Sequence, residues 1–190
     1  MDAVYALLQQ SSARNLTMEA VAREAGVGKP TLYNWWPSKS ALIMDMFHER
    51  IDPAPEAVQS PTAEAAIRAK VKRLVRLLNG LFGKVVSELI AEAQSDAAIM
   101  EDLHTRHMNG RWEAIRRDVE RGKADGEFRS DTDPDIVIQT IFGAMYYRLL
   151  LRFGPLTQAY GEKLVDQVLA GIRPVTSAEP RPRKAPAKRS

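Results

Sequence analysis

The sequence contains no cysteine, and this absence excludes several chemistries at once. Without thiols the chain forms no disulfides and no zinc–thiolate sites, and it offers no cysteine nucleophile. A long uninterrupted apolar run is also missing. Residues 136–153 contain Gln139, Arg148 and Arg152, so they fit a buried or interfacial helix better than a membrane span. The first residues lack the basic n-region of a secretory signal peptide, and we expect a cytoplasmic protein without membrane contact.

A surplus of one charge is missing from most of the chain. Residues 1–50 carry five basic and five acidic side chains, although the whole sequence has a net charge of +3 and a pI near 9.2. The surplus lies in residues 173–190, where six basic residues and one acidic residue stand among prolines and alanines. Since this segment has no apolar periodicity, we predict a disordered basic tail, which can also add nonspecific attraction to DNA.

The alternation of apolar and polar residues that is typical of strands is missing too, and nearly every segment has helical spacing. The pattern predicts helices over residues 3–12, 18–25, 30–36, 39–50, 62–79, 83–94, 96–122, 134–153 and 157–172. The run Asp52-Pro-Ala-Pro55 is the natural domain boundary. We therefore predict an all-α fold with an N-terminal three-helix domain over residues 1–50 and a C-terminal helical bundle over residues 51–172.

Residues 17–37 show the start and stop signals of two short helices joined by a tight turn. Thr17 is a good N-cap, and Gly26 suits the left-handed position after a helix end. Pro30 suits the first turn of the next helix, and Pro37 ends that helix. A helix, a glycine-containing turn and a short helix form the helix-turn-helix arrangement of many DNA-binding domains.

The second of these helices ends with two adjacent tryptophans, which cannot both face one core. On a helical wheel Leu32 and Trp36 share a face, while Asn34 lies nearly opposite. Trp35 lies at the edge of the outward face. We therefore predict that Trp36 fills the core of this domain and that Trp35 packs on a sugar-phosphate backbone.

The outward residues have the chemistry of a DNA-contacting surface. Lys29 and Lys39 can neutralise phosphates, and the Tyr33 phenol can donate to a phosphate oxygen. Asn34 and Lys29 can read base edges, and the Thr31 methyl group can contact a thymine. These residues predict a DNA-binding surface on the second short helix.

The stretch Thr17-Met-Glu-Ala-Val-Ala-Arg-Glu-Ala-Gly-Val-Gly-Lys-Pro-Thr-Leu-Tyr-Asn-Trp-Trp-Pro-Ser-Lys39 closely resembles the DNA-binding domain of TetR-type transcriptional regulators. Their pattern has Thr at the helix start, Ala-Gly-Val at the turn, Thr-Leu-Tyr on the recognition helix, an aromatic pair and then Ser-Lys. Together with the wheel, the resemblance gives a predicted DNA-contacting set of Thr17, Gly28, Lys29, Pro30, Thr31, Tyr33, Asn34, Trp35 and Lys39.

The resemblance also implies how such a protein works. It implies a homodimer that binds a palindromic operator in double-stranded DNA, and a repressor that a small-molecule effector releases from this operator. The C-terminal domain would supply the dimer interface and the effector pocket. An alternative from another class is an all-helical dimeric interaction module whose helix-turn-helix does not bind DNA. We do not expect an enzyme, because no nucleophile–base pair supports one.

Two sets of residues in the C-terminal half are assigned to these roles. The helix over 134–153 is apolar on nearly all sides, which fits either a dimer element or the central helix of a monomer. The predicted dimer interface comprises Ile141, Tyr146, Leu149, Leu150, Phe153, Leu164 and Val168. Core packing is the alternative role for the residues of the predicted effector pocket, which are Phe82, Met100, Met108, Trp112, Phe142, Met145 and Tyr146.

Two charged clusters allow either a ligand-binding or a structural role. Glu101, His104 and His107 have a spacing that can hold a metal, but no second helix supplies a ligand, so we interpret them as a solvated helix face. Arg148 and Arg152 lie one turn apart, where they can form an ion pair across the dimer or bind an anionic effector. We predict no metal site and no cofactor.

Overall fold

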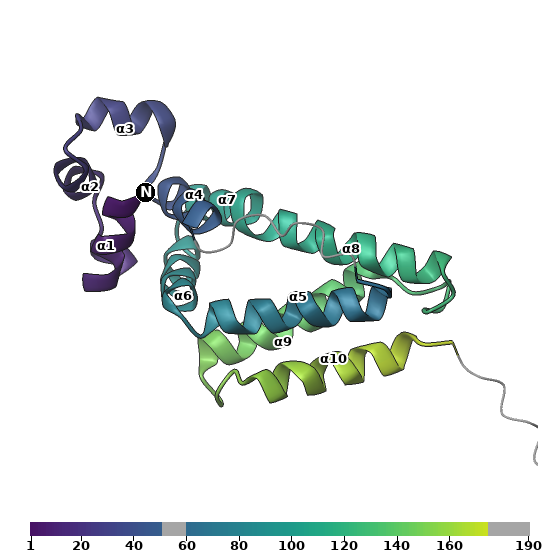
Figure 1. Cartoon of the computed structure of the whole chain (residues 1–190). Coiled ribbons are helices and arrows are strands. Elements are labelled where there is room, and N and C mark those ends of the chain that lie inside the picture. The colour runs from purple at the N-terminus through teal and green to yellow at the C-terminus, as the bar shows by residue number, and fades with distance from the viewer. Residues whose placement is uncertain (51–59, 175–190) are drawn as a thin grey trace, which may run out of the picture.

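The computed structural model describes residues 1–50 and 60–174, and within these ranges every regular element is helical. This confirms the predicted all-α fold. Figure 1 shows a small group of helices at one end of the molecule and a longer helical body beside it. The predicted boundary run at 52–55 and residues 175–190 of the predicted tail lie outside the described residues. In the described part of the chain, none of the helices is long and apolar enough to span a bilayer.

The small group of helices, which we call the head, comprises residues 1–50. It contains α1 (Asp2–Gln10), the 3-10 turn η1 (Ala13–Asn15), α2 (Met18–Ala25), α3 (Lys29–Trp35) and α4 (Lys39–Arg50). The Thr17 hydroxyl accepts a 3.1 Å hydrogen bond from the Ala20 N–H, as expected of an N-cap. Gly26 has a left-handed φ of 66°, and the Val27 N–H then reaches the Ala22 carbonyl at 3.0 Å. The predicted end signals of α2 are therefore confirmed.

The remaining helices form the body. They are α5 (Ala63–Leu78), α6 (Leu81–Ala93), α7 (Ala97–Asp102), the π-helical turn η2 (Leu103–Met108), α8 (Asn109–Ala124), α9 (Pro134–Leu151) and α10 (Gln158–Ile172). In Figure 1, α5, α8, α9 and α10 run along the length of the body, while α6 and α7 lie next to the head. Residues 97–124 are helical without a break, close to the predicted helix over 96–122, but the π-helical turn η2 interrupts the α-helical geometry between α7 and α8.

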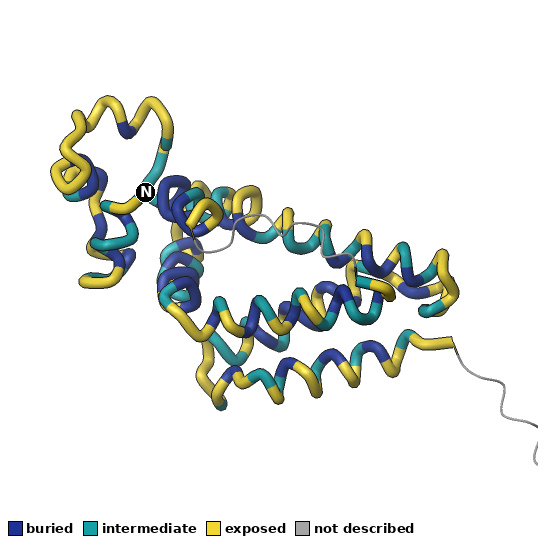
Figure 2. Tube along the Cα trace, in the orientation of Figure 1, coloured by how far each residue is buried: buried dark blue, intermediate teal, exposed yellow. Residues whose placement is uncertain are grey.

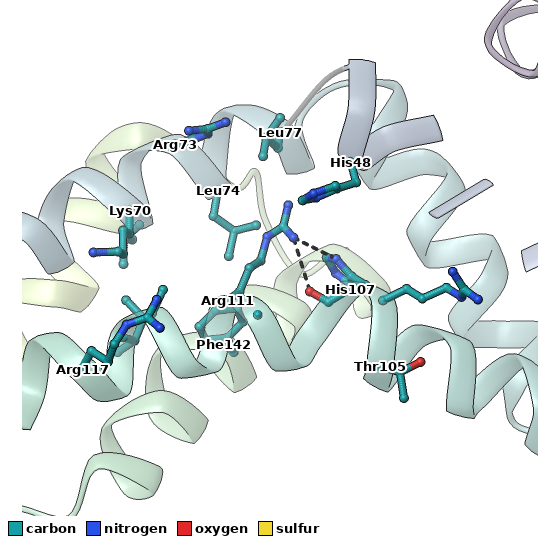
Figure 3. Close-up of a pocket in the computed structure, with 15 residues that line it drawn as sticks. His48, Lys70, Arg73, Leu74, Leu77, Thr105, His107, Arg111, Arg117 and Phe142 are labelled. Carbon is teal, nitrogen blue, oxygen red and sulfur yellow. Dashed lines mark hydrogen bonds between the residues drawn. The ribbon is translucent and has the colours of Figure 1, made fainter. Parts of the chain in front are cut away.

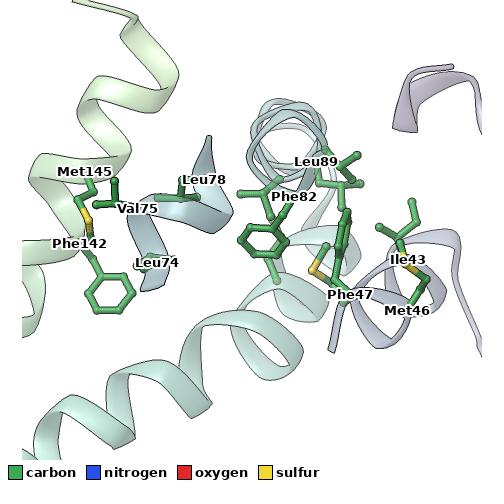
Figure 4. Packing of buried hydrophobic residues seen from close by; sticks show 14 of the residues in the cluster. Ile43, Met46, Phe47, Leu74, Val75, Leu78, Phe82, Leu89, Phe142 and Met145 are labelled. Carbon is green, nitrogen blue, oxygen red and sulfur yellow. The ribbon is translucent and has the colours of Figure 1, made fainter. Parts of the chain in front are cut away.

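Buried apolar side chains extend through both the head and the body (Figure 2). Figure 4 shows where they meet: Phe47 of α4 packs edge-on against Phe82 of α6, with ring centroids 5.0 Å apart. Both rings are buried. Since burial of a phenylalanine side chain contributes about 1.5–3 kcal/mol, this contact holds the head on the body by packing.

Polar contacts also tie α4 to the body. The Ser38 and Ser40 hydroxyls donate to the Asp102 carboxylate at 2.5 and 2.6 Å. One turn further, Arg106 of η2 donates to Asp45 at 3.0 Å. The last helix of the head is therefore held against the end of α7 and the π-helical turn.

Candidate nucleic-acid interface and internal cavity

The recognition helix α3 has one buried anchor and several exposed side chains. Leu32 is 6% exposed, whereas Tyr33 and Trp35 are 46% and 75% exposed. Figure 2 shows this helix as a largely exposed tube at the outer end of the head. The structure brings most of the predicted DNA-contacting set onto this segment, since it exposes Gly28, Lys29, Pro30, Thr31, Tyr33, Asn34 and Trp35.

The two tryptophans differ in exposure, as predicted, but the helical wheel does not apply to Trp36, because α3 ends at Trp35. Trp35 ends α3 and faces solvent, while Trp36 is half-buried and packs on the core. Trp36 turns inward because the helix has already ended: its φ is −130° and its ψ is 111°, which is extended backbone. The ring is not fully enclosed, and its indole N–H donates to Asp45 at 3.0 Å. Trp36 is therefore both a core residue and a polar link to α4.

The Lys29 ammonium pairs with the Glu19 carboxylate of α2, across the helix-turn-helix. The hydrogen bond from Lys29 lowers the pKa of Glu19, and the same contact raises the pKa of Lys29. The ammonium also lies 5.9 Å from the centre of the Tyr33 ring. Because both charged groups are exposed, a phosphate can compete with Glu19 for this ammonium.

Lys39 does not join the outward face of α3. Its ammonium donates to the Ala13 carbonyl at 2.9 Å and lies 3.4 Å from the Glu92 carboxylate of α6. The side chain is only 23% exposed. The structure thus uses Lys39 to join the head to α6. Thr17 is exposed at the start of α2, where its hydroxyl caps the helix.

A second candidate site is a cavity of about 430 Å³ between α5 and α8 (Figure 3). Small-molecule sites commonly have volumes of about 300–1,000 Å³. One face of each helix lines it, and the π-helical turn, His48 of α4 and Phe142 of α9 complete the walls. Apolar side chains form much of the surface, and five basic residues also line it: Lys70, Arg73, Arg106, Arg111 and Arg117.

His107 lies on the π-helical turn, and its ring is inside the body. The ring is 3% exposed, so our interpretation of His107 as part of a solvated face is wrong, while His104 is exposed. A π turn closes its hydrogen bonds over five residues instead of four. It therefore rotates later residues relative to an uninterrupted helix, which the regular spacing in the sequence does not reveal.

His107 forms a buried polar link beside the cavity. Its Nε2 lies 2.6 Å from the Tyr146 hydroxyl, and Arg111 donates to its Nδ1 at 3.2 Å. Because a guanidinium only donates, Nδ1 accepts and Nε2 carries the proton. Burial, together with the positive charge of Arg111, lowers the pKa of His107 to about 3, so the ring is neutral. Burial also raises the pKa of Tyr146.

Most residues of the predicted effector pocket lie outside the walls of this cavity. Of that set only Phe142 lines the cavity. Phe82 and Met145 are buried core residues, and Met100, Met108 and Trp112 are half-buried outside its walls. Tyr146 reaches the cavity only through His107. The predicted pocket is drawn from apolar and aromatic side chains. It therefore omits the basic residues on one face of α5 and of α8, which line this cavity.

The predicted dimer interface is partly available on the surface of α9 and the segment that follows it. Leu150 and Phe153 are 39% and 72% exposed, and the neighbouring Tyr147 stacks on Phe153 at 5.3 Å. Leu149, Leu164 and Val168 are half-buried. Ile141 is fully buried in the chain's own core and offers no surface to a partner, which corrects its assignment.

The remaining charged groups have local roles. Arg148 donates to the Pro155 carbonyl at 2.9 Å, and its guanidinium lies 3.7 Å from the Tyr160 ring centre. This guanidinium is therefore engaged within its own chain. Arg152 follows α9 with a left-handed φ of 55°. Within residues 1–50 and 60–174, no three His, Asp or Glu side chains are placed to share a metal ion.

Two family models match the chain. One, described as bacterial regulatory proteins of the tetR family, matches residues 1–46. The other, described as the C-terminal domain of tetracyclin repressor-like proteins, matches residues 59–168. The two matches together cover the helix-turn-helix and most of the body.

Individual proteins agree with these matches. An uncharacterised HTH-type transcriptional regulator of Bacillus subtilis (strain 168), YdeS, is 30% identical over 94% of this chain and 90% of its own. An uncharacterised HTH-type regulator of Mycobacterium bovis, Mb1581, is 27% identical over 86% of this chain and 80% of its own. The crystal structure of the TetR family transcription regulator SCO0332 matches with a TM-score of 0.77 and 30% identity, over 90% of this chain and 95% of that one. The chain therefore belongs to the TetR family of bacterial transcriptional regulators.

Proposed function

We propose that this protein is a homodimeric repressor that binds a palindromic operator through α3 and leaves it when a small molecule occupies the body. The observation that carries the proposal is the outward face of α3. Tyr33, Asn34 and Trp35 are exposed there, while Leu32 alone anchors this helix in the core. A short helix of this kind can enter the major groove, where an amide side chain can read an adenine and aromatic edges can contact the backbone.

Dimerisation supplies the second half-site contact that a palindrome requires. The exposed apolar side chains at the end of α9, including Leu150, Leu151 and Phe153, support this role. A cluster of this kind is costly to leave in water and suits a self-complementary interface. As a DNA-bound regulator, the dimer would act in the cytoplasm.

The link between the cavity and the head supports the effector part of the proposal. Arg106 lines the cavity and also donates to Asp45 of α4. The same Asp45 carboxylate accepts the indole N–H of Trp36, which directly follows α3. A molecule that draws Arg106 into the cavity would therefore loosen a contact that orients the recognition helix.

The decisive experiment is a titration of the DNA upstream of the protein's own gene, read by fluorescence anisotropy. We expect saturable binding by a dimer, and scrambled DNA of equal length should compete for it only weakly. The Asn34→Ala variant should lose preference for the operator by about 1–3 kcal/mol if this amide reads a base. A substitution of Leu150, which lies outside the head, would test assembly and not base reading. A wild type that binds neither DNA would favour the interaction module instead.

A further inference from the structure

We propose that the cavity between α5 and α8 binds an anionic amphiphile, a molecule with an apolar body and one carboxylate, sulfonate or phosphate group. That this molecule is the effector rests on the proposed function. The claim that it binds stands on the walls of the cavity alone.

The basic side chains approach the cavity from several elements. Lys70 comes from α5, Arg111 and Arg117 come from α8, and Arg106 comes from the π-helical turn. Figure 3 shows Lys70 and Arg117 on opposite walls at one end, and Arg111 beside His107 toward the other. Of the described residues that line the cavity, none is acidic. A recess with low-dielectric walls and one sign of charge attracts an ion of the opposite sign.

The carboxylates that balance these cations lie behind the walls. Lys70 pairs with Asp118, and Arg106 pairs with Asp45. Arg117 is exposed and forms no ion pair within residues 1–50 and 60–174. An incoming anion can therefore contact at least one guanidinium without first displacing a described carboxylate. His107 adds no charge, because the ring is neutral.

The same cavity has an apolar floor. Val71, Leu74 and Leu77 line it from α5, and Ile115 and Phe142 line it from the facing elements. A small inorganic anion would leave these side chains in contact with water. A neutral apolar molecule would cover the guanidinium groups without giving them an acceptor, which is costly. Only a ligand that combines both features satisfies the floor and the basic walls together.

Two fluorescent probes that differ by one charged group test this inference. The anionic probe is 8-anilinonaphthalene-1-sulfonate, and the neutral probe is N-phenyl-1-naphthylamine, which has the same aromatic body without the sulfonate. Each is titrated against the full chain without DNA, and fluorescence is recorded. We expect one sulfonate probe per chain, bound about 10-fold or more tightly than the neutral probe, as a charge-assisted hydrogen bond provides.

The Arg117→Met variant should bind the sulfonate probe about 10-fold more weakly than wild type. Its affinity for the neutral probe should stay within about twofold of wild type. Unchanged binding of the neutral probe shows that this variant is folded. Arg76→Met is the matched control, because Arg76 is exposed on α5 and does not line the cavity. It should change neither probe.

Equal affinity of the two probes for the wild type, or an Arg117→Met variant that binds the sulfonate like wild type, would overturn the inference. Neither result would argue against operator binding, because the assay contains no DNA. Conversely, if the protein binds the sulfonate as expected but binds no operator, the inferred ligand class stands and the proposed function fails.

Discussion

The indole N–H of Trp36 donates a 3.0 Å hydrogen bond to Asp45, nine residues later in the chain. The same carboxylate accepts two contacts from Arg106, at 3.0 and 3.2 Å. One aspartate therefore joins the residue after the recognition helix to a side chain that lines the cavity. Without this carboxylate, the Trp36 indole N–H and the Arg106 guanidinium would face water or an apolar surface. The carboxylate therefore fixes the position of the end of α3 relative to α4.

The Trp36→Phe substitution removes the indole N–H and keeps an aromatic ring on the core. We expect the free energy of unfolding to fall by about 1 kcal/mol, the usual net worth of such a hydrogen bond. Urea unfolding followed by circular dichroism measures the change. In an Asp45→Ala background, which removes the acceptor, the same substitution should cost clearly less, and equal costs in both backgrounds would refute the link.

The Trp35→Ala substitution should separate DNA binding from stability. Trp35 is 75% exposed, so its loss should change the free energy of unfolding by about 0.5 kcal/mol or less. DNA binding should weaken by about 1 kcal/mol or more, since exposed tryptophans frequently dominate interfaces. The two measurements are urea unfolding and anisotropy titration. A head that melts in this variant would contradict the placement of Trp35 on the outward face.

The Glu19→Gln substitution should tighten DNA binding. Glu19 pairs with the Lys29 ammonium, and removing its charge leaves that ammonium free to neutralise a phosphate. The slope of log K against log salt should become steeper by about one unit, because about one more counterion is released. Titrations at several salt concentrations measure this. Glu24→Gln, which removes another exposed acidic charge of α2, is the control for net charge. A similar gain in slope for both variants would show that the Lys29 pair is not responsible.

The Leu150→Arg substitution should convert the proposed dimer into monomers. Leu150 is 39% exposed in the single chain, so an arginine fits the fold but would bury an unpaired charge at a self-complementary surface, at a cost of several kcal/mol. Light scattering gives the mass. Val27→Arg, at a similarly exposed apolar residue of the head, should remain dimeric. A monomeric wild type at micromolar concentration would remove the basis of this prediction.

The buried His107 should make the fold sensitive to acid. Its pKa is about 3 in the folded protein and 6.5 ordinarily, so the folded state resists protonation. Between pH 6.5 and 3 the unfolded state therefore binds a proton that the folded state does not. The free energy of unfolding is unaffected above pH 6.5 and falls by up to about 1.4 kcal/mol per pH unit as the pH drops toward 3. The His107→Gln variant keeps a side-chain donor for Tyr146 and cannot be protonated. Its unfolding free energy should depend less steeply on pH between 6 and 4, and an identical slope would contradict the assignment.

The sequence by itself determined the head, because its signals are local. A threonine N-cap, a glycine that tolerates positive φ and a proline that ends a helix each act within one turn of chain. The exposure of Trp35 follows from helical spacing alone. The N-terminus of α9 follows the same local chemistry, since the Asp133 carboxylate accepts from the Asp135 and Ile136 N–H groups.

The tertiary structure decided the positions that depend on distant partners. Lys39 points to Glu92, 53 residues away, and not toward DNA. Its ammonium donates hydrogen bonds to the Glu92 carboxylate and to the Ala13 carbonyl. His107 is buried because Phe82 of α6 and Tyr146 of α9 pack against its ring, and these distant partners cannot be read from the pattern of its own helix. The cavity needs basic residues from α5 and α8 to converge, and only the packing of these two helices brings them together.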